Sequence, residues 1–423
     1  MSFNTISVVG LGYIGLPTAA MFASKEKKVI GVDVNQHAVD TINAGKIHIV
    51  EPELDVMVRK AVEGGFLKAV TSPEPADAFL IAVPTPFLPT ASEGEIPQPN
   101  LTYIQTAAES IAKVLKKGDL VILESTSPVG TTEQMAKWMA EVRPDLTFPP
   151  SQGEGADIMV AHCPERVLPG HVVRELVEND RVIGGMTERC SKAAIELYKI
   201  FVKAECVVTN ARTAEMAKLT ENSCRDVQIA FANELSIICD KLDINVWELI
   251  SLANRHPRIN ILSPGPGVGG HCIAVDPWFI ISKSPHESNL IHCARKVNDY
   301  KPQWVIDKVK LAVTDLLSLY PTKTIDNITV ACFGLAFKAD IDDLRESPSL
   351  DITKAISELN IGKVLVVEPN IDILPQNLRN VELVNAEQAL NTADLCVLLV
   401  DHKEFKNLNT QSKNIIDTRG IWS

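Results

Sequence analysis

The chain has 423 residues, 46% hydrophobic and 22% charged, a composition typical of a globular protein with more than one domain. A net charge of -12 and a pI near 5.3 argue against nucleic acid or an anionic membrane as partner. No segment approaches the roughly 20 consecutive apolar residues that cross a bilayer. Nine scattered cysteines without metal-ligand spacing indicate reduced thiols, a cytoplasmic location and no metal site.

The first half of the chain alternates apolar strand patterns with helical patterns, which is typical of a parallel sheet. Runs this apolar suit strands that are buried on both faces. The clearest predicted strands are 6–10, 28–33, 78–83 and 120–124. We expect surface loops at 84–100 and 144–155, which are rich in proline and polar residues.

A dinucleotide-binding signature, Gly10-Leu-Gly12-Tyr-Ile-Gly15, stands between the first predicted strand and a helical run. Gly10 permits the tight turn, Gly12 lets backbone amides approach a pyrophosphate, and Gly15 allows close helix–strand packing. Asp33 ends the next strand and would accept hydrogen bonds from ribose hydroxyls. Because no Lys or Arg follows in 34–37 to bind a 2′-phosphate, NAD is favoured over NADP. The alternative is an ordinary strand–turn–helix without a ligand.

Three polar residues follow other predicted strands of this region. Thr85 and Thr126 end two strands where a nicotinamide would lie, although either could instead cap a helix. Glu165 lies in a loop after a strand, where a glutamate is more often structural than catalytic.

A long helix is predicted over 210–242, because apolar residues recur there at steps of three and four. Such a helix could be a spine between domains or a subunit interface. Lys218 and Asn222 are four residues apart and share one face, with Arg225 close to it. The alternative for Lys218 is a solvated surface lysine.

Cys272 follows a glycine- and proline-rich run that begins at Ser263. Exposed backbone amides in such a loop could stabilise a thiolate or an oxyanion, which favours covalent chemistry over a small buried hydrophobe. Asp276 lies four residues on and is followed by Pro277, so it could either act in catalysis or cap the next helix.

The C-terminal third repeats the plan of the first, with predicted strands at 328–335, 363–368, 393–400 and 414–417. The second copy lacks the three-glycine turn, so we expect it to bind something other than the same dinucleotide. The fold class is α/β: two doubly wound Rossmann-like domains joined by a central helical segment with a long helix. The expected domains are 1–205, 206–300 and 301–423. Basic residues available for an anionic substrate are Arg166, His256, Arg258, Lys338 and Arg419, each of which could also be plain surface charge.

Six ordered motifs spread over essentially the whole chain resemble the UDP-glucose/GDP-mannose dehydrogenase family. They are Gly10–Gly15, Ser125-Thr-Ser-Pro-Val-Gly130, Cys163-Pro-Glu-Arg166, Lys218-Leu-Thr-Glu-Asn222, Gly267-Val-Gly-Gly-His-Cys272 and Gly334-Leu-Ala-Phe-Lys338. One departure is visible: many relatives have Pro-Lys-Asp after the cysteine, whereas this chain has Ala274-Val-Asp276. That missing lysine weakens any role that rests on it, but Cys272 and Asp276 keep their spacing.

The resemblance implies a role for each site residue. It implies Cys272 as nucleophile and Lys218 as general acid/base, with Asn222 and Asp276 in support and Asp276 or Glu165 assisting the hydrolytic water. The residues implied for NAD, besides the glycines, are Tyr13, Ile14, Asp33, Thr85, Thr126 and Arg345. Those implied for the substrate are Arg166, Val167, Lys218, Asn222, Arg225, His256, Arg258, Gly269, Phe337, Lys338 and Arg419. The C-terminal repeat would bind the UDP moiety and the long helix would form a homodimer.

The activity implied is an NAD-dependent four-electron oxidation of a UDP-sugar, from the C6 alcohol to the carboxylate through a cysteine thiohemiacetal and thioester. Similarity within the family, at 253–258 and 264–272, implies UDP-N-acetyl-D-mannosamine as substrate and a surface polysaccharide of the enterobacterial common antigen type as destination. UDP-N-acetylglucosamine and UDP-glucose remain alternatives. So do a two-electron hydroxyacid or 6-phosphogluconate type of dehydrogenase, an epimerase or dehydratase that retains NAD, and a non-catalytic NAD-sensing protein.

Overall fold

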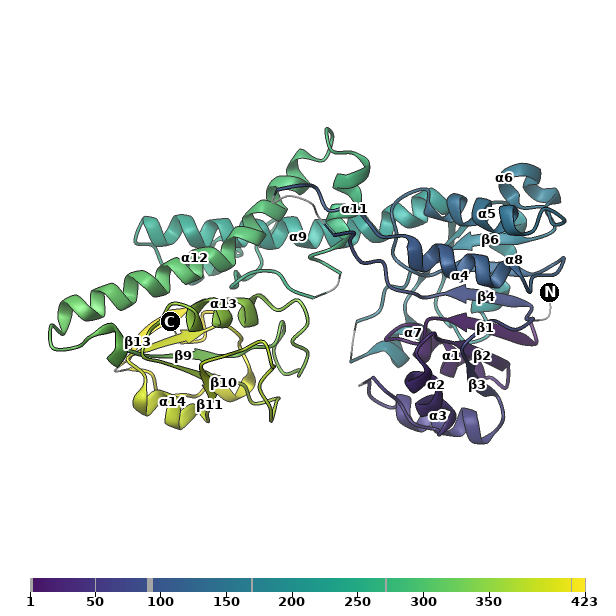
Figure 1. Ribbon diagram of the computed structural model, residues 1–423. Coiled ribbons are helices and arrows are strands. Elements are labelled where there is room, and N and C mark those ends of the chain that lie inside the picture. The colour runs from purple at the N-terminus through teal and green to yellow at the C-terminus, as the bar shows by residue number, and fades with distance from the viewer. Residues whose placement is uncertain are drawn as a thin grey trace. The chain divides into compact units, whose positions relative to one another are not determined.

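The computed structural model describes residues 3–49, 51–89, 94–168, 170–270, 272–411 and 413–422. It divides into two compact units, shown with their elements in Figure 1. The first unit comprises Met1–Glu221 and Trp278–Pro285, and the second comprises Asn222–Pro277 and His286–Ser423. Two helices contribute to both units: α9 (Ala211–Lys241) and α11 (Asp276–Lys283).

An eight-stranded sheet with the order β3-β2-β1-β4-β5-β6-β7-β8 forms the centre of the first unit. Its strands are β1 (Thr5–Val9), β2 (Lys28–Val32), β3 (Leu67–Val70), β4 (Ala78–Ile81), β5 (Leu120–Leu123), β6 (Met159–His162), β7 (Arg181–Gly185) and β8 (Cys206–Asn210). All neighbours are parallel except β6 and β7. The order reverses between β1 and β4, and open sheets of this kind bind ligands at the carboxyl ends of the strands at such a point.

Helices cover both faces of this sheet because its strands are apolar on both sides. The helices are α1 (Gly15–Ala23), α2 (Gln36–Asn43), α3 (Leu54–Glu63), α4 (Thr102–Ala112), α5 (Thr131–Val142), α6 (Pro149–Gln152), α7 (Val172–Glu178) and α8 (Glu188–Tyr198), with a 3-10 turn at Gly153–Gly155. One buried cluster joins the sheet to α1, α2, α3, α7 and α8, and a second joins the other face to α4 and α5. Asn35 and Thr187 start α2 and α8 by accepting hydrogen bonds from backbone amides of the first turn.

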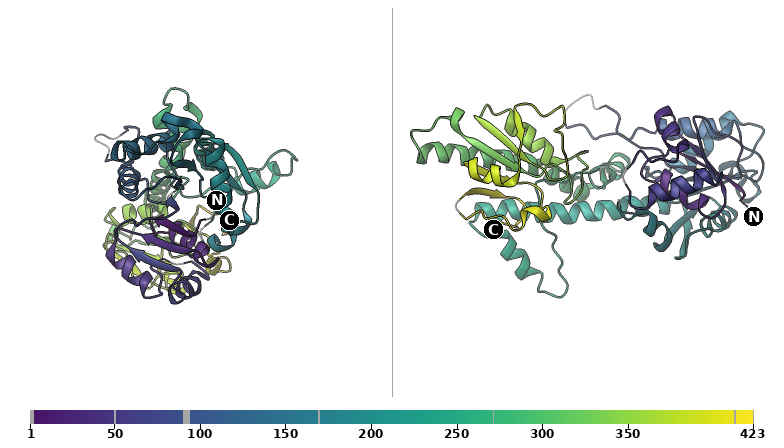
Figure 2. Two further views of the ribbon diagram at one scale, coloured as in Figure 1. Left: turned by 90° about the vertical axis from the view of Figure 1, so that its right-hand side faces the viewer. Right: turned by 90° about the horizontal axis from the view of Figure 1, so that it is seen from below.

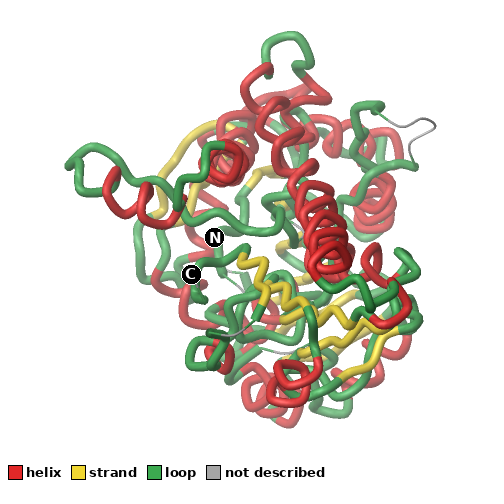
Figure 3. Tube along the Cα trace, turned by 90° about the vertical axis from the view of Figure 1, so that its left-hand side faces the viewer, coloured by secondary structure: helices red, strands yellow, loops and turns green. Residues whose placement is uncertain are grey.

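A five-stranded parallel sheet, β11-β10-β9-β12-β13, forms the centre of the second unit. Its strands are β9 (Thr329–Phe333), β10 (Lys363–Val367), β11 (Val381–Leu383), β12 (Leu395–Leu398) and β13 (Asn414–Asp417). Its helices are α10 (Val246–Ala253), α12 (Asn289–Leu319), α13 (Pro348–Ser357) and α14 (Ala386–Thr392), with 3-10 turns at Ile325–Asn327 and Lys403–Phe405. α12 and α13 pack on one face of the sheet and α14 on the other. Figure 3 shows the strands in yellow among the red helices.

The two sheets repeat one backbone plan in detail. Gly10 and Gly334 both have a positive φ, and the N–H of each donates to the last residue of the adjacent strand, Val32 or Val367, at 2.8 Å. The next amide donates to an acidic side chain in each copy: Leu11 to Asp33 at 2.9 Å, and Leu335 to Glu368 at 2.7 Å. The repeat predicted from the sequence is therefore a repeat of hydrogen bonds as well as of strands.

The structure confirms the α/β class, the paired Rossmann-like sheets and the long helix α9, which Figure 2 shows as continuous. One expectation is corrected: the segment 144–155 is not all loop, because Pro149 and Pro150 start the short helix α6 and a 3-10 turn follows. The helix α12 was not anticipated, and residue 300, the expected end of the central domain, lies inside it.

Candidate active site

The glycine turn between β1 and α1 has the shape that dinucleotide binding requires. Gly10 has a φ of +91°, and a Cβ there would lie 2.5 Å from the Ala82 carbonyl oxygen. A Cβ on Gly15 would lie 1.7 Å from the Gly10 oxygen, so α1 packs against the strand only because residue 15 is glycine. Around Gly12 a Cβ would meet no atom within 4 Å, which leaves the backbone of the turn open to a ligand. The turn therefore fits the pyrophosphate of a dinucleotide at the start of α1.

Asp33 lies beside this turn, directly after β2. One carboxylate oxygen accepts the Leu11 N–H at 2.9 Å and the other accepts the Asn35 N–H at 2.9 Å. Asp33 is half-buried, and its hydrogen bond to Leu11 holds the carboxylate at the glycine turn. This placement suits a ribose acceptor. Of the other two residues implied at this turn, Tyr13 packs partly against the core and Ile14 immediately precedes α1.

The two threonines expected near the nicotinamide contact each other. Thr85, after β4, donates its hydroxyl to the Thr126 carbonyl at 2.6 Å. Ser125 donates to the Val83 carbonyl at 2.7 Å, which also joins the segments that follow β4 and β5. Both threonines are half-buried at the carboxyl ends of neighbouring strands. Arg345, also expected to contact NAD, belongs to the second unit, is exposed and forms an ion pair with Asp343 at 2.6 Å.

Glu165 belongs to a buried polar cluster of the first unit. Its carboxylate forms an ion pair with Arg181 of β7 at 2.6 Å and accepts the Arg166 N–H at 2.7 Å. The guanidinium of Arg181 also stacks 4.3 Å above the Tyr198 ring and lies 3.6 Å from Glu124. Because burial outweighs the attraction of Arg181, the pKa of Glu124 rises to about 7. Glu165 is thus held in place by a buried arginine rather than exposed in a free loop.

Arg166, implied for substrate binding, is already paired within the first unit. Its guanidinium contacts the Glu221 carboxylate of α9 at 2.6 Å and donates to the Asp180 carbonyl at 3.3 Å. Val167 is partly buried against the hydrophobic core. An anionic ligand at Arg166 would therefore compete with Glu221.

Asn222 and Asp276, which the resemblance implies as supporting residues, form a hydrogen bond in the second unit. The Asn222 amide donates to the Asp276 carboxylate at 2.5 Å, and Asp276 is buried at the start of α11. The amides of Val275 and Asp276 both donate to the Cys272 carbonyl, which forms one turn between the cysteine and the aspartate. Cys272 itself is exposed. Lys218 is half-buried one helical turn before Asn222 on α9.

The glycine loop before Cys272 lies tightly against its own unit. A Cβ on Gly269 would lie 2.4 Å from the Glu346 carbonyl oxygen, and one on Gly270 would touch the Phe337 ring at 3.2 Å. Phe337, expected to contact the substrate, therefore lines this loop. Arg419 also lies against it, since its guanidinium would be 2.7 Å from a Cβ on Gly265. Its charge pairs with Asp401 at 2.6 Å.

The remaining substrate candidates are exposed in the second unit: Arg225, His256, Arg258 and Lys338. His256 accepts the Arg258 N–H at 3.4 Å in the turn after α10. This hydrogen bond joins two residues that are both exposed.

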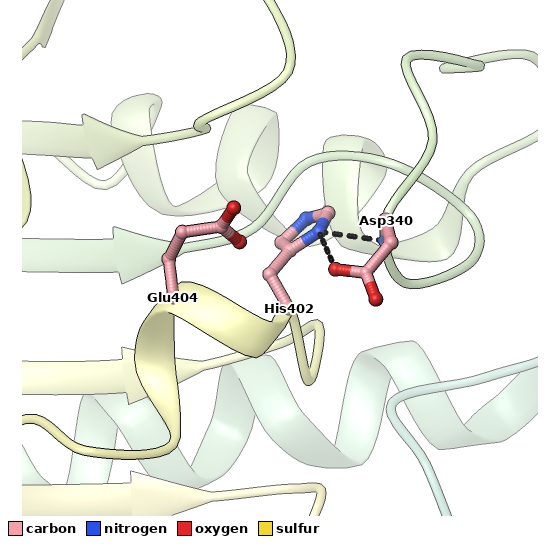
Figure 4. Close-up of side chains that lie close together, drawn as sticks. All are labelled: Asp340, His402 and Glu404. Carbon is pink, nitrogen blue, oxygen red and sulfur yellow. Dashed lines mark hydrogen bonds and ion pairs between the residues drawn. The ribbon is translucent and has the colours of Figure 1, made fainter.

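One cluster of possible metal ligands was found in the part of the chain described above: Asp340, His402 and Glu404, shown in Figure 4. The Asp340 N–H donates to His402 Nδ1 at 2.9 Å, so His402 Nε2 carries the proton and faces Glu368 at 3.1 Å. With both ring nitrogens engaged, His402 has no lone pair for a metal. The histidine instead donates a hydrogen bond to the buried acid of the second repeat: burial raises the pKa of Glu368, but the hydrogen bonds from His402 and Leu335 lower it below its usual value.

Two residues that position the site were missed by the sequence analysis. Arg181 holds Glu165, and Glu215 of α9 accepts hydrogen bonds from Gly130 and Thr132, at the start of α5. The sequence offers one sign of each residue, which is a charged side chain within an apolar or helical pattern. Arg181 begins an apolar run, and Glu215 precedes Lys218 by three residues on the predicted helix. Neither pattern says which partner a buried charge will find.

Three family models match consecutive parts of the chain. They are described as the NAD-binding, central and UDP-binding domains of the UDP-glucose/GDP-mannose dehydrogenase family, and they match residues 4–202, 212–300 and 331–423. None of the helices in the described ranges has both the length and the apolar character needed to span a membrane.

Curated relatives match over the full length. A UDP-N-acetyl-D-mannosamine dehydrogenase of Yersinia pestis is 65% identical over 426 residues, covering 100% of both chains. An NDP-N-acetyl-D-galactosaminuronic acid dehydrogenase of Ralstonia nicotianae is 63% identical, covering 100% of this chain and 97% of the relative. Among solved structures, a UDP-D-ManNAc dehydrogenase from Pyrococcus horikoshii has a TM-score of 0.84 and 38% identity, covering 99% of this chain and 96% of its own.

Proposed function

The chain belongs to the UDP-glucose/GDP-mannose dehydrogenase family, and we propose that it oxidises the 6-hydroxyl of UDP-N-acetyl-D-mannosamine to the carboxylate with NAD as oxidant. NAD is the cofactor of the matched N-terminal domain, and the open glycine turn with Asp33 fits it. The mannosamine sugar is supported by the name of the Yersinia pestis relative.

A second substrate has similar support. The Ralstonia nicotianae relative is named for an N-acetylgalactosaminuronic acid and is 63% identical, against 65% for the mannosamine relative. The two sequence identities are too similar to favour the mannosamine sugar over the galactosamine sugar. The galactosamine nucleotide sugar is therefore the second candidate, ahead of UDP-N-acetylglucosamine and UDP-glucose.

The observation that carries the four-electron mechanism is the Asn222–Asp276 hydrogen bond beside Cys272. It joins α9, one turn after Lys218, to the aspartate that ends the turn of an exposed cysteine. A two-electron alcohol dehydrogenase requires no nucleophile. An exposed cysteine joined by one backbone turn to a buried aspartate suits an enzyme that captures an aldehyde and then hydrolyses an acyl intermediate.

We assign the chemistry to the chain's residues as follows. Lys218 takes the proton of the 6-hydroxyl, directly or through water, as the aldehyde forms. The Cys272 sulfur then adds to the aldehyde carbon as a thiohemiacetal, and Lys218 offsets the charge on its oxygen. NAD held at the glycine turn and Asp33 would supply the hydride acceptor for both oxidations. Loss of the second hydride and of the hydroxyl proton leaves a thioester on Cys272.

Hydrolysis of the thioester supplies the second oxygen of the carboxylate. Asp276, oriented by Asn222, or Glu165, oriented by Arg181, accepts the proton of the attacking water. Cleavage of the carbon–sulfur bond returns the thiol. Over the cycle, one alcohol and one water give one carboxylate, and two NAD molecules are reduced.

Recognition of the nucleotide is assigned to the second unit. Support comes from the family model for a UDP-binding domain over residues 331–423, and from the Arg419 side chain that lies against the loop before Cys272. We propose contacts from Arg225, His256, Arg258, Phe337 and Lys338, and from Arg166 and Val167 of the first unit. We propose that residues 1–205 bind NAD, that residues 206–300 carry the catalytic lysine and cysteine and form the dimer, and that residues 301–423 bind the UDP-sugar.

The setting of the reaction is also a proposal. Nine free cysteines suit a reducing cytoplasm. A uronic acid nucleotide suits the synthesis of a surface polysaccharide, of the enterobacterial common antigen type if the sugar is N-acetylmannosamine. We propose a homodimer formed through α9, whose exposed apolar residues support it.

The deciding experiment measures NADH formed per nucleotide sugar consumed, with each of the four candidate sugars at limiting concentration. We expect two NADH per UDP-N-acetyl-D-mannosamine and little turnover of the others. Two NADH with the galactosamine sugar alone would replace the substrate but keep the mechanism. One NADH per sugar would overturn the covalent scheme.

The matched variant is Cys272→Ser in the same assay. We expect NAD and sugar to bind with affinities close to the wild type and acid formation to be lost, because serine does not capture the aldehyde as a thiolate does. The exposed Cys293→Ser serves as control and should retain both NADH equivalents. Acid formation by Cys272→Ser at near the wild-type rate would contradict the role of Cys272.

A further inference from the structure

The loop that leads to Cys272 carries four glycines between Gly265 and Gly270, so its own side chains do little to fix its path. Neighbouring backbone and proline rings confine its second half. A Cβ on Gly267 would lie 2.8 Å from Pro348 and 3.0 Å from Pro302, and the Gly270 N–H donates to the Glu346 carbonyl at 3.3 Å. The first half of the loop is held differently, by a side chain of α9.

That side chain is Asn233, which is completely buried. Its Oδ1 accepts the Gly265 N–H at 2.9 Å, and its Nδ2 donates to Oδ1 of Asn298 on α12 at 2.9 Å. Asn298 in turn donates to the Asp226 carboxylate at 2.8 Å, and Asp226 pairs with Arg295 at 2.6 Å. We call these four side chains the Asn233 relay. None is more than 2% exposed.

The relay fixes which end of the Asn233 amide faces the loop. Asn298 Nδ2 also donates to the Asp226 backbone carbonyl at 3.0 Å, and a carbonyl can only accept. Asn298 must therefore present its oxygen to Asn233, and Asn233 must present its NH₂ group to Asn298. This leaves the Asn233 oxygen for Gly265. The order of donors and acceptors follows from chemistry and does not depend on how either amide was drawn.

We propose that Asn233 is a positioning residue for the loop of Cys272. By holding the Gly265 N–H it fixes where the loop leaves the α9–α12 pair and so where the thiol is presented to the sugar. It is not a catalytic residue, because its amide contacts the loop backbone and not the thiol. The proposal rests on the role proposed for Cys272.

The test is Asn233→Leu, which keeps the number and branching of the side-chain heavy atoms and removes both hydrogen bonds. We expect kcat for NADH formation to fall about 10-fold or more, because a nucleophile displaced by about 1 Å loses reactivity steeply. The KM for NAD should stay within about two-fold, since the loop belongs to the other unit. Amide hydrogen exchange over 263–270, measured by mass spectrometry, should rise about 10-fold or more.

Two controls separate positioning from loss of the fold. Asn43→Leu removes a chemically matched pair of bonds, between a side-chain amide and the backbone of Ala69 in the first unit, and should leave kcat and exchange over 263–270 unchanged. In Asn233→Leu, the buried Cys239 and Cys332 should remain protected from alkylation while the exposed Cys224 and Cys293 react at wild-type rates.

Wild-type kcat, or wild-type exchange over 263–270, in a folded Asn233→Leu protein would overturn the proposal. If that variant does not fold, Asn233→Ser carries the same expectation, because its hydroxyl cannot reach Gly265 and Asn298 together. Hydrogen exchange needs no activity. Wild-type acid formation by Cys272→Ser would therefore refute Cys272 as nucleophile. The hydrogen exchange over 263–270 in Asn233→Leu would still show whether Asn233 holds the loop.

Discussion

Two buried carboxylates, Glu124 and Glu165, share the guanidinium of Arg181, which lies 2.6 Å from Glu165 and 3.6 Å from Glu124. The closer carboxylate takes most of the attraction, and Glu124 is left with the Tyr198 hydroxyl at 2.6 Å. Burial, together with the negative charge of Glu165, therefore raises the pKa of Glu124 to about 7 despite Arg181. Within this cluster Glu165, for which we propose a role in hydrolysis, stays paired with Arg181.

This shift makes a prediction about stability and pH. The folded protein binds the Glu124 proton more tightly than the unfolded chain does, so the stabilisation is complete below the ordinary glutamate pKa and is lost as pH rises through about 7. Glu124→Gln should remove this loss of stability, which is on the order of 2 kcal/mol. The free energy of unfolding of the variant should therefore change less with pH. Thermal unfolding of the first unit, followed by calorimetry from about pH 5 to about pH 8, measures it.

The control is Glu188→Gln, at an exposed carboxylate of the same unit paired with Lys192. It should show the wild-type dependence on pH, because an exposed group gains little from folding. If Glu124→Gln loses stability with rising pH as steeply as the wild type, Glu124 is not the group that takes up the proton.

At the scale of elements, Glu215 joins the start of α9 to the start of α5. Its buried carboxylate accepts the Gly130 N–H at 2.6 Å, and the Thr132 N–H and hydroxyl at 2.8 and 2.6 Å. These are amides that a helix leaves unpaired at its N-terminus, so Glu215 caps α5 from another helix. The contact links Lys218, one turn further on α9, to the segment of Thr126.

We therefore expect Glu215→Leu to lower the free energy of unfolding by about 2–4 kcal/mol, because it leaves buried amides unpaired. It should also raise the KM for NAD several-fold more than the KM for the sugar, since Thr126 and Gly130 share one loop. Chemical unfolding and steady-state kinetics give the two numbers.

The same two helices supply the control, because Glu133 of α5 forms an exposed ion pair with Arg212 of α9 at 2.7 Å. Glu133→Gln should change both quantities little, since exposed ion pairs contribute little. Equal effects of Glu215→Leu and Glu133→Gln would mean that the α5–α9 contact, and not the buried cap, matters.

At the scale of the whole molecule, α9 carries apolar residues on its exposed side. Phe231 is 51% exposed, Ile238 46% and Leu242, directly after the helix, 60%. Spaced seven and four residues apart, they form one stripe along the helix. A stripe of large apolar side chains left exposed is typical of a contact surface and supports the proposed homodimer.

The dimer prediction is tested by Phe231→Glu combined with Ile238→Glu. We expect the wild type to have about twice the chain mass of 46.2 kDa, and the double variant to have the mass of one chain, because two like charges would face their copies across the two-fold axis. Light scattering after size exclusion measures both. Ile373→Glu, at an exposed apolar residue away from α9, should remain a dimer. A wild type with the mass of one chain would refute the proposal.

The local elements could be predicted from the sequence because their signals are local. The strands that carry the glycine turn, the acid at the end of the second strand and the long helix each follow from periodicity or from a motif within about 30 residues. The repeated strand plan of the C-terminal third could also be predicted, because each of its strands is a local apolar run. The sequence predicts only loop over 144–155, because the four residues of α6 are too few to show a helical period.

Only the tertiary structure decided which buried charges and amides meet. Arg181 and Glu165, Glu215 and Thr132, and Asn233 and Gly265 are 16, 83 and 32 residues apart in the chain. Each needs its partner because a polar group removed from water without a hydrogen bond is costly. Many partners would satisfy that need, and only the packing of helices on the sheets selects one. The family of this protein and its NAD-dependent oxidation could therefore be inferred from its motifs, whereas the buried partners that hold its elements together could not.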